Sequence, residues 1–159
     1  MQRIIYLLAA ALTIASCSSI DCPLNNTVAT TYKLKGDVTK LSDTLTIVTP
    51  RIDGNDTVVL NKAVAVDSFI VPVSHSNRED VLYFKLTNTD RQTFTDTVRI
   101  SKTNIPHFES VDCPPNFFHK IERIACTHHA IDSIVINNAN VEYDASKAHF
   151  HIYFKKYLY

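Results

Sequence analysis

The sequence predicts an all-β protein, a two-sheet antiparallel β-sandwich of immunoglobulin-like type with about eight or nine strands. Downstream of Cys22, short runs of β-branched and aromatic residues alternate with polar ones, and Asn, Asp, Ser and Pro bound these runs. No long stretch repeats its apolar residues with the helical period of about 3.6 residues. Because each sheet must bury one face, a sandwich accommodates many short strands better than an open sheet does. A small closed β-barrel is the alternative.

The expected strands follow one another along the chain, with polar or proline-containing segments between them. Each has β-branched or aromatic residues at alternate positions, which is the pattern of a strand with one buried face. They are Val28–Leu34, Asp43–Val48, Thr57–Asn61, Ser68–Val73, Val81–Thr87, Phe94–Ser101, Phe117–Cys126, Ser133–Asn137 and Ala148–Lys155.

The turns between these strands are rich in Asn and Asp. Since the chain has only two glycines, we expect the left-handed turn positions to fall to Asn and Asp, which tolerate a positive φ better than other residues with side chains. The turns expected on this basis are Asp53-Gly54-Asn55-Asp56, Asn88-Thr89-Asp90 and Asn137-Asn138. Pro72 lies inside a strand run and cannot donate a ladder hydrogen bond, so its strand should be an edge strand or bulged.

A five-residue pattern of Asp, then Thr or Ser, then apolar residues at the third and fifth positions recurs at irregular spacing. One interpretation is a strand start, in which Asp bonds the amides of its own turn and the two apolar residues point inward. Four of the five copies also resemble the Asp-[Ser/Thr]-aliphatic acceptor that Bacteroidota use for O-glycosylation of exported proteins. That resemblance implies glycans on Thr44, Thr57, Thr97 and Ser133, and both interpretations can hold together. The copies begin at Asp43, Asp56, Asp67, Asp96 and Asp132.

Residues 1–16 have the composition of a secretory signal peptide. One cation, Arg3, precedes the apolar run Ile4–Leu12, and small and hydroxylated residues follow. The run is well short of the roughly 20 apolar residues of a membrane-spanning helix. Ile14-Ala15-Ser16-Cys17 resembles a bacterial lipobox, in which the cysteine is lipidated before cleavage. A secretory signal followed by a chance cysteine is the alternative.

The lipobox interpretation divides the chain into three parts. The mature chain should begin at Cys17, which acyl chains would hold in a membrane, each buried CH₂ contributing about 0.8 kcal/mol. Residues 17–26 are then a lipidated tether, and residues 27–159 a single β-sandwich domain.

The cysteines left after lipidation of Cys17 form at most one disulfide within the chain. Cys22 and Cys113 both occur as Asp-Cys-Pro, and the proline leaves each thiol in an irregular loop where bridge geometry is easy to reach. We therefore expect a Cys22–Cys113 disulfide, with Cys113–Cys126 as the alternative. Cys126 lies in an apolar stretch and is interpreted as a small buried hydrophobic residue.

His149-Phe150-His151 is the strongest candidate for a metal site. On a strand, His149, His151 and Tyr153 share one face, and paired imidazoles bind zinc or copper where further ligands converge. Neither His119 nor the adjacent His128-His129 supplies an evident third ligand. The favoured interpretation is the solvated polar face of a strand, and no metal is expected.

Composition and motifs argue against several functional classes. The 16 Lys and Arg balance 16 Asp and Glu, so the chain lacks the basic footprint of a nucleic-acid-binding protein. Gly36 and Gly54 stand alone and form no Gly-rich phosphate loop. Neither GxSxG nor HExxH occurs. We therefore expect no enzyme, no catalytic residue, no cofactor and no nucleic-acid partner.

Several segments together resemble a family of small uncharacterised lipoproteins of Bacteroidota. The resemblance covers nearly the whole mature chain and implies a Gram-negative envelope, but no activity or ligand. Ser18 rather than Asp after the lipidated cysteine implies the outer membrane, and the single acid in residues 18–21 favours its periplasmic face. The segments are the lipobox, Asp21–Asn26, the Asp-Thr strands, Phe108–Cys113, Ile131–Ile134 and His149–Ile152.

The expected function is that of a non-catalytic module of the cell envelope. A lipid anchor would hold it at the membrane, and loops or an edge strand would bind an envelope protein or glycan. The alternative is a carbohydrate-binding accessory lipoprotein at the cell surface, which would offer exposed tyrosines to sugar faces. The candidate tyrosines are Tyr143, Tyr153, Tyr157 and Tyr159.

Overall fold

The structure is a computed structural model of the chain, and it describes residues 22, 28–51, 53–144 and 146–156. The predicted signal peptide, Cys17 and all of the predicted tether except Cys22 lie outside the described residues, as do Tyr157 and Tyr159.

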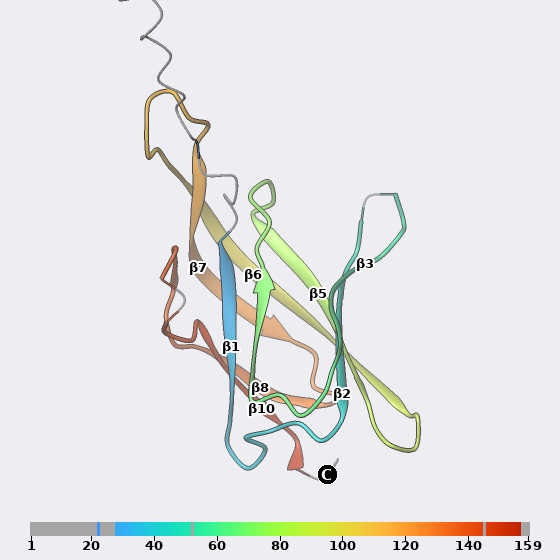
Figure 1. The fold of residues 1–159 in the computed structure, drawn as a ribbon. Helices are drawn as coiled ribbons and strands as arrows, with labels where there is room; N and C mark the ends of the chain where they lie inside the picture. The colour runs from blue at the N-terminus through green and yellow to red at the C-terminus, as the bar shows by residue number, and fades with distance from the viewer. Residues whose placement is uncertain (1–21, 23–27, 52, 145, 157–159) are drawn as a thin grey trace, which may run out of the picture.

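The described residues form the predicted β-sandwich, with two separate sheets instead of a closed barrel (Figure 1). One sheet has four strands in the order β4-β1-β10-β8, and the other has six in the order β3-β2-β5-β6-β7-β9. The strands are β1 (Ala29–Lys35), β2 (Thr44–Thr49), β3 (Thr57–Ala63), β4 (Ser68–Pro72), β5 (Glu79–Thr87), β6 (Thr93–His107), β7 (Asn116–Cys126), β8 (Ile131–Ile136), β9 (Asn140–Val141) and β10 (Phe150–Phe154).

Three features of the sheets differ from the sequence prediction. β1 pairs with β10 in parallel, so the sandwich is not wholly antiparallel. The long path through the other sheet between these two strands permits the parallel pairing. β9 has two residues, too few for an alternating pattern. β6 continues to His107, beyond the expected end at Ser101. The prediction ended the strand early because Lys102, a charged residue that faces inward, interrupts the apolar alternation.

Pro72 lies where its chemistry predicts. It ends β4, which is an edge strand of the four-stranded sheet and pairs only with β1 among the described strands. A proline there leaves no central ladder position without its donor.

The prediction that Asn and Asp would take the left-handed turn positions is wrong. The described residues with side chains and positive φ are Lys62, Ala65 and Arg91. In the β5–β6 turn, Asn88 bonds Gln92 and also accepts from the amide of Arg91, which fixes a three-residue loop. Such a loop requires a left-handed residue at its third position. The pairing register of the hairpin therefore places Arg91 there, whatever its side chain.

The core lies between the two sheets and centres on Tyr32, whose side chain is fully buried. Its ring stacks on Phe69 and approaches Phe150, with centroids 4.9 and 4.8 Å away. Phe84 of the six-stranded sheet meets the same ring edge-on at 5.7 Å. Aromatic pairs in these geometries contribute stabilisation beyond the apolar area that they bury. Since the rings come from both sheets, the cluster joins the two sheets directly.

The inward positions of the Asp-Thr pattern are confirmed in four of its five copies, where the third and fifth residues are buried or pack on the core. The exception is Val58, which is 52% exposed. Of the two register shifts between β2 and β3, the one between Ile47 and Val48 separates the inward Leu60 from Val58. Since each one-residue shift moves a side chain to the other face, Val58 turns outward.

The pattern predicts that Asp96 starts a strand. In the structure it lies within β6 instead, with its side chain fully buried. One carboxylate oxygen accepts from the Thr127 hydroxyl at 2.8 Å and the His129 amide at 2.7 Å. The other accepts from the amides of Ala130 and Ile131, at 2.7 and 2.8 Å. These donors form the crossover from β7 to β8, so Asp96 fixes the segment that connects the six-stranded sheet to the four-stranded one.

Asp96→Asn should lower the free energy of unfolding by about 3 kcal/mol, because the amide nitrogen leaves buried N–H donors without an acceptor. Urea unfolding checks this value. Asp90→Asn, an exposed change in the β5–β6 turn, is the control and should stay within about 0.5 kcal/mol of wild type. Equal stability of the two variants would contradict the role of Asp96.

Candidate functional site

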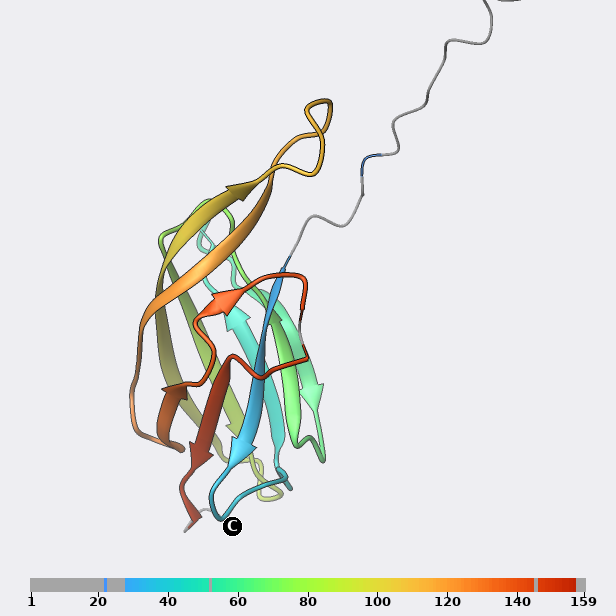
Figure 2. The same cartoon turned by 90° about the vertical axis from the view of Figure 1, so that its left-hand side faces the viewer.

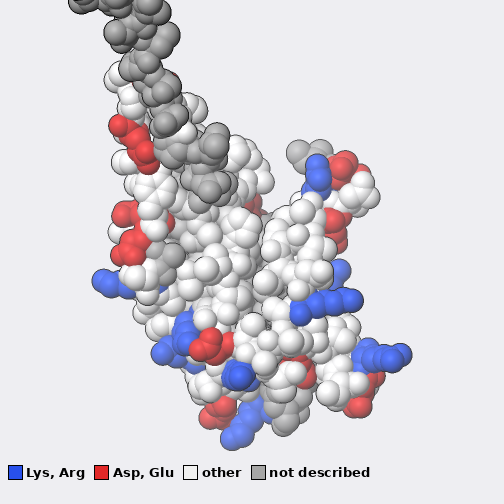
Figure 3. Space-filling model, in the orientation of Figure 1, with Lys and Arg blue, Asp and Glu red and all other residues white. Residues whose placement is uncertain are grey.

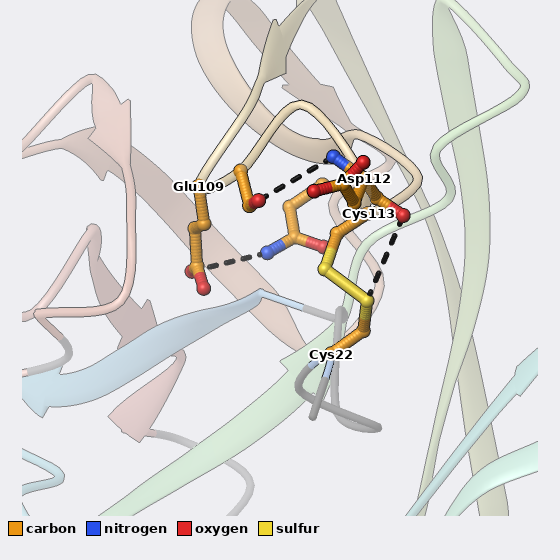
Figure 4. Close-up of a disulfide and its surroundings, with 6 residues drawn as sticks. Cys22, Glu109, Asp112 and Cys113 are labelled. Atoms are coloured by element: carbon orange, nitrogen blue, oxygen red, sulfur yellow. Dashed lines mark hydrogen bonds between the residues drawn. A yellow bond between two sulfur atoms is a disulfide. The ribbon is translucent and has the colours of Figure 1, made fainter. Parts of the chain in front are cut away.

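The end of the sandwich that bears Cys22 carries the clearest covalent feature. Cys22 forms a disulfide with Cys113, 91 residues later, as the sequence predicts (Figure 4). Cys113 belongs to residues 108–115, the turn between β6 and β7, which we call the hairpin tip. Figure 2 shows the hairpin tip projecting beyond the sheets, at the end opposite the last described residues. The disulfide therefore joins the start of the folded body to its most protruding loop.

The hairpin tip exposes apolar side chains. Val111 is 98% exposed and Phe108 is 64% exposed. Ile105 of β6, just below the tip, is also exposed. The sequence contained a signal for this surface, since apolar residues lie in a Pro-, Ser- and Asp-rich turn, but no prediction used Phe108 or Val111 as an exposed surface.

An aromatic cluster stiffens the base of the hairpin tip. His107 stacks on Phe118 with centroids 4.3 Å apart, and Tyr143 meets Phe118 edge-on at 4.9 Å. The Tyr143 hydroxyl donates to Glu109 at 2.6 Å and also bonds Asn116. Glu109 therefore faces the stem of the hairpin, away from the disulfide (Figure 4). These contacts hold the tip in one orientation relative to the sheets.

Charge is distributed unevenly along the molecule. On the face drawn in Figure 3, Lys and Arg side chains gather mostly over the half away from the hairpin tip. The sequence between Asn104 and Phe118 contains no Lys or Arg, and its acidic residues are Glu109 and Asp112. The hairpin tip is thus apolar and weakly acidic.

A buried ion pair lies under the β4–β5 loop. The Lys102 ammonium is 3.1 Å from Asp80, and their side chains are 0% and 10% exposed. Lys102 also donates to the Asn77 carbonyl at 2.6 Å. Burial raises the pKa of Asp80, while Lys102 and the Ser74 amide oppose that rise. The sequence held a signal here, because Lys102 continues the inward alternation of Val98 and Ile100, but no prediction used it.

Asn104 and His119 extend this buried cluster. The His119 Nδ1 atom is 2.8 Å from the Asn104 carbonyl oxygen, and the Asn104 amide donates to the backbone of His75 and Asn77. Burial, together with electrostatic repulsion from Lys102 and His75, lowers the pKa of His119 to about 4. His119 is therefore neutral at pH 7 and donates to Asn104.

An open hollow of about 560 Å³ lies beside this cluster, lined by residues of the β4–β5 loop, β5, β6 and β7. Both of its carboxylates are bonded: Glu79 pairs with Arg99 at 2.9 Å, and Glu122 accepts from the Thr103 hydroxyl. Its lining is polar and contains no aromatic ring. The hollow thus lacks the flat aromatic surface on which a sugar ring stacks.

The structure separates the histidines considered as metal ligands. The prediction that His149 lies on the solvated face of a strand is wrong, because His149 is fully buried just before β10. Its Nδ1 accepts from the Thr31 amide at 3.0 Å, and burial lowers its pKa. His151 is half-buried on the outward face of β10, as predicted, while His128 lies beside Cys126. The described residues contain no cluster of three His, Cys, Asp or Glu side chains that could hold a metal.

The predicted modification sites lie on strands. Thr44, Thr57, Thr97 and Ser133 are half-buried residues of β2, β3, β6 and β8. Cys126 is a free, half-buried thiol that packs against the core, and burial raises its pKa. No helix among the described residues is long and apolar enough to cross a membrane.

Comparison with known proteins identifies one family. The model of DUF6452, a family of unknown function, matches residues 44–154. The match spans β2 to β10 and includes Asp96, Lys102 and the hairpin tip, whereas Cys17 and Cys22 precede it. No curated protein and no solved structure matches the chain.

His119 should make the fold sensitive to mild acid. In the unfolded chain its pKa is near 6.5, so the unfolded state binds a proton that the folded state excludes, and stability falls as the pH drops from about 6.5 to 4. His119→Asn keeps a donor toward Asn104 but does not titrate. Between pH 7 and 4.5, wild type should lose about 2 kcal/mol more than this variant in urea unfolding.

The control for this measurement is His129→Asn, which replaces an exposed histidine outside the cluster. It should follow wild type across the pH range. Parallel losses in wild type and His119→Asn would assign the acid sensitivity to another group.

Proposed function

The chain belongs to the DUF6452 family of unknown function, and we propose that it is an outer-membrane lipoprotein whose β-sandwich is a non-catalytic interaction module of the cell envelope. Residues 1–16 are the signal peptide, 17–26 the lipidated tether and 27–159 the β-sandwich domain. Acyl chains on Cys17 anchor the mature protein, and the body lies on the periplasmic face. The composition of residues 18–21 supports this placement.

The Cys22–Cys113 disulfide carries the proposal. Disulfides form and persist in oxidising compartments such as the periplasm and are rare in the cytosol. This one begins five residues after Cys17, and it ties the end of the proposed tether to the folded body. The disulfide thus adds a second covalent link between the proposed tether and the body, beside the backbone itself.

The pairing of polar groups supports a non-catalytic role. Catalytic acids and bases face a site that substrate can reach. In the described structure, Lys102 and Asp80 instead bond each other in the interior, and His119 bonds Asn104. Around the open hollow, Glu79 and Glu122 are bonded to neighbouring side chains.

The open sheet edges support a protein partner. β3 and β4 are edge strands of the two sheets and contact each other, so both edges lie on one side of the sandwich. Val58 of β3 and Ile70 of β4 are 52% and 55% exposed. An edge strand offers unpaired N–H and C=O groups to an added strand.

Cys17→Ala should release the protein from the membrane fraction of its native host, because without acyl chains the described body has no other anchor of comparable strength. Fractionation and intact mass measure this result. Ser19→Ala, which leaves the lipobox unchanged, should remain with the membrane. A Cys17→Ala protein that stays bound, together with a wild-type mass without acyl groups, would refute the anchor.

We also propose O-glycans on Thr44, Thr57, Thr97 and Ser133. Their strand neighbours Leu45, Val98 and Ile134 point inward, so the hydroxyls of Thr44, Thr97 and Ser133 face outward. The intact mass of protein from the native host should exceed the acylated mass by glycan increments, and Thr→Val and Ser→Ala changes at these sites should remove them. A mass without increments would refute glycosylation.

A further inference from the structure

The hairpin tip has the chemistry of a small membrane-contacting surface. The apolar side chains of Val111 and Phe108 are 98% and 64% exposed. Apolar side chains at a protruding apex enter the boundary between headgroups and acyl chains with little rearrangement of the body. Glu109, the nearest acid on the stem side, is held by Tyr143 and Asn116, away from the apex.

The length of chain before Cys22 limits where this surface can lie. From Cys17 to Cys22 there are five residues, which span at most about 18 Å even when extended. The disulfide then adds only the short link from Cys22 to Cys113, whose Cα atoms are 5.6 Å apart. A lipid on Cys17 therefore keeps Cys113 near the bilayer, and Val111 is two residues from Cys113.

We propose that the hairpin tip is a second membrane contact, in which Val111 and Phe108 insert into the lipid interface beside the acylated cysteine. This inference rests on the proposed anchor at Cys17. The disulfide keeps the tip at the membrane, and the cluster of His107, Phe118 and Tyr143 keeps it from folding back. The bilayer is thus the surface that covers the exposed apolar residues.

The charge of the hairpin tip defines the kind of bilayer. Residues between Asn104 and Phe118 carry two acids and no Lys or Arg, so anionic headgroups do not attract this surface. The contact is apolar and suits a zwitterionic leaflet.

A seated tip also orients the body. β6 has 15 residues, about 50 Å in extended form, and it runs from the hairpin tip to the β5–β6 turn at the far end (Figure 2). The sheets would stand away from the membrane, with their open edges and basic half accessible to a partner.

The sequence contains no tryptophan, so a single introduced indole reports its own surroundings. Val111→Trp and Phe108→Trp place one at the tip of the full acylated protein. Val64→Trp and Val135→Trp are matched controls at residues 58% and 51% exposed elsewhere. The proteins are reconstituted into phosphatidylcholine vesicles with and without brominated acyl chains. A side chain in the interface lies roughly 5–10 Å deep, so brominated lipid should quench tip emission at least about twofold.

The controls should keep a solvent-like emission that brominated lipid leaves unchanged. The mass of the acyl groups and flotation with vesicles test the anchor separately. A protein that carries no acyl mass and does not float would refute the proposed function. An acylated, floating protein whose tip indoles emit like the controls would overturn the membrane contact. Blue-shifted tip emission without lipid quenching would also overturn it, because a protein surface, including a second copy of the chain, would then cover the tip.

Discussion

The buried carboxylate of Asp96 is the constraint on which the arrangement of the two sheets depends. Four donors from the β7–β8 crossover converge on its two oxygens. The backbone of a crossover cannot satisfy its N–H groups through a sheet ladder, and a buried donor without a partner is costly. A single side chain from the six-stranded sheet thus fixes where the chain enters the other sheet.

A second polar cluster supports the opposite half of the sandwich. Lys102, Asp80, Asn104 and His119 satisfy one another and the β4–β5 loop. A buried ion pair adds little net stability over apolar packing, but loss of one partner leaves an uncompensated charge. The cluster therefore fixes the conformation of the loop above it more than it strengthens the fold, and it makes that end of the protein sensitive to acid through His119.

The two ends of the molecule differ in chemistry. One bears the disulfide, the apolar hairpin tip and few cations, whereas basic side chains concentrate toward the other (Figure 3). The proposed anchor and membrane contact use the first end, and the proposed partner surface uses the unpaired edges of β3 and β4. Because these surfaces do not overlap, the protein could bind its partner while held at the bilayer.

Local patterns were enough to predict the sandwich, most strand positions, the edge position of Pro72 and the Cys22–Cys113 pairing, because alternation, proline chemistry and a shared Asp-Cys-Pro context can be read from neighbouring residues. Tertiary structure alone decided the parallel β1–β10 pair, the left-handed Arg91, the outward Val58 and the burial of His149. Tertiary structure also decided that Asp96, in one copy of the repeated pattern, is buried and binds the β7–β8 crossover. Each of these depends on register or on a partner distant in the chain, which local patterns do not encode.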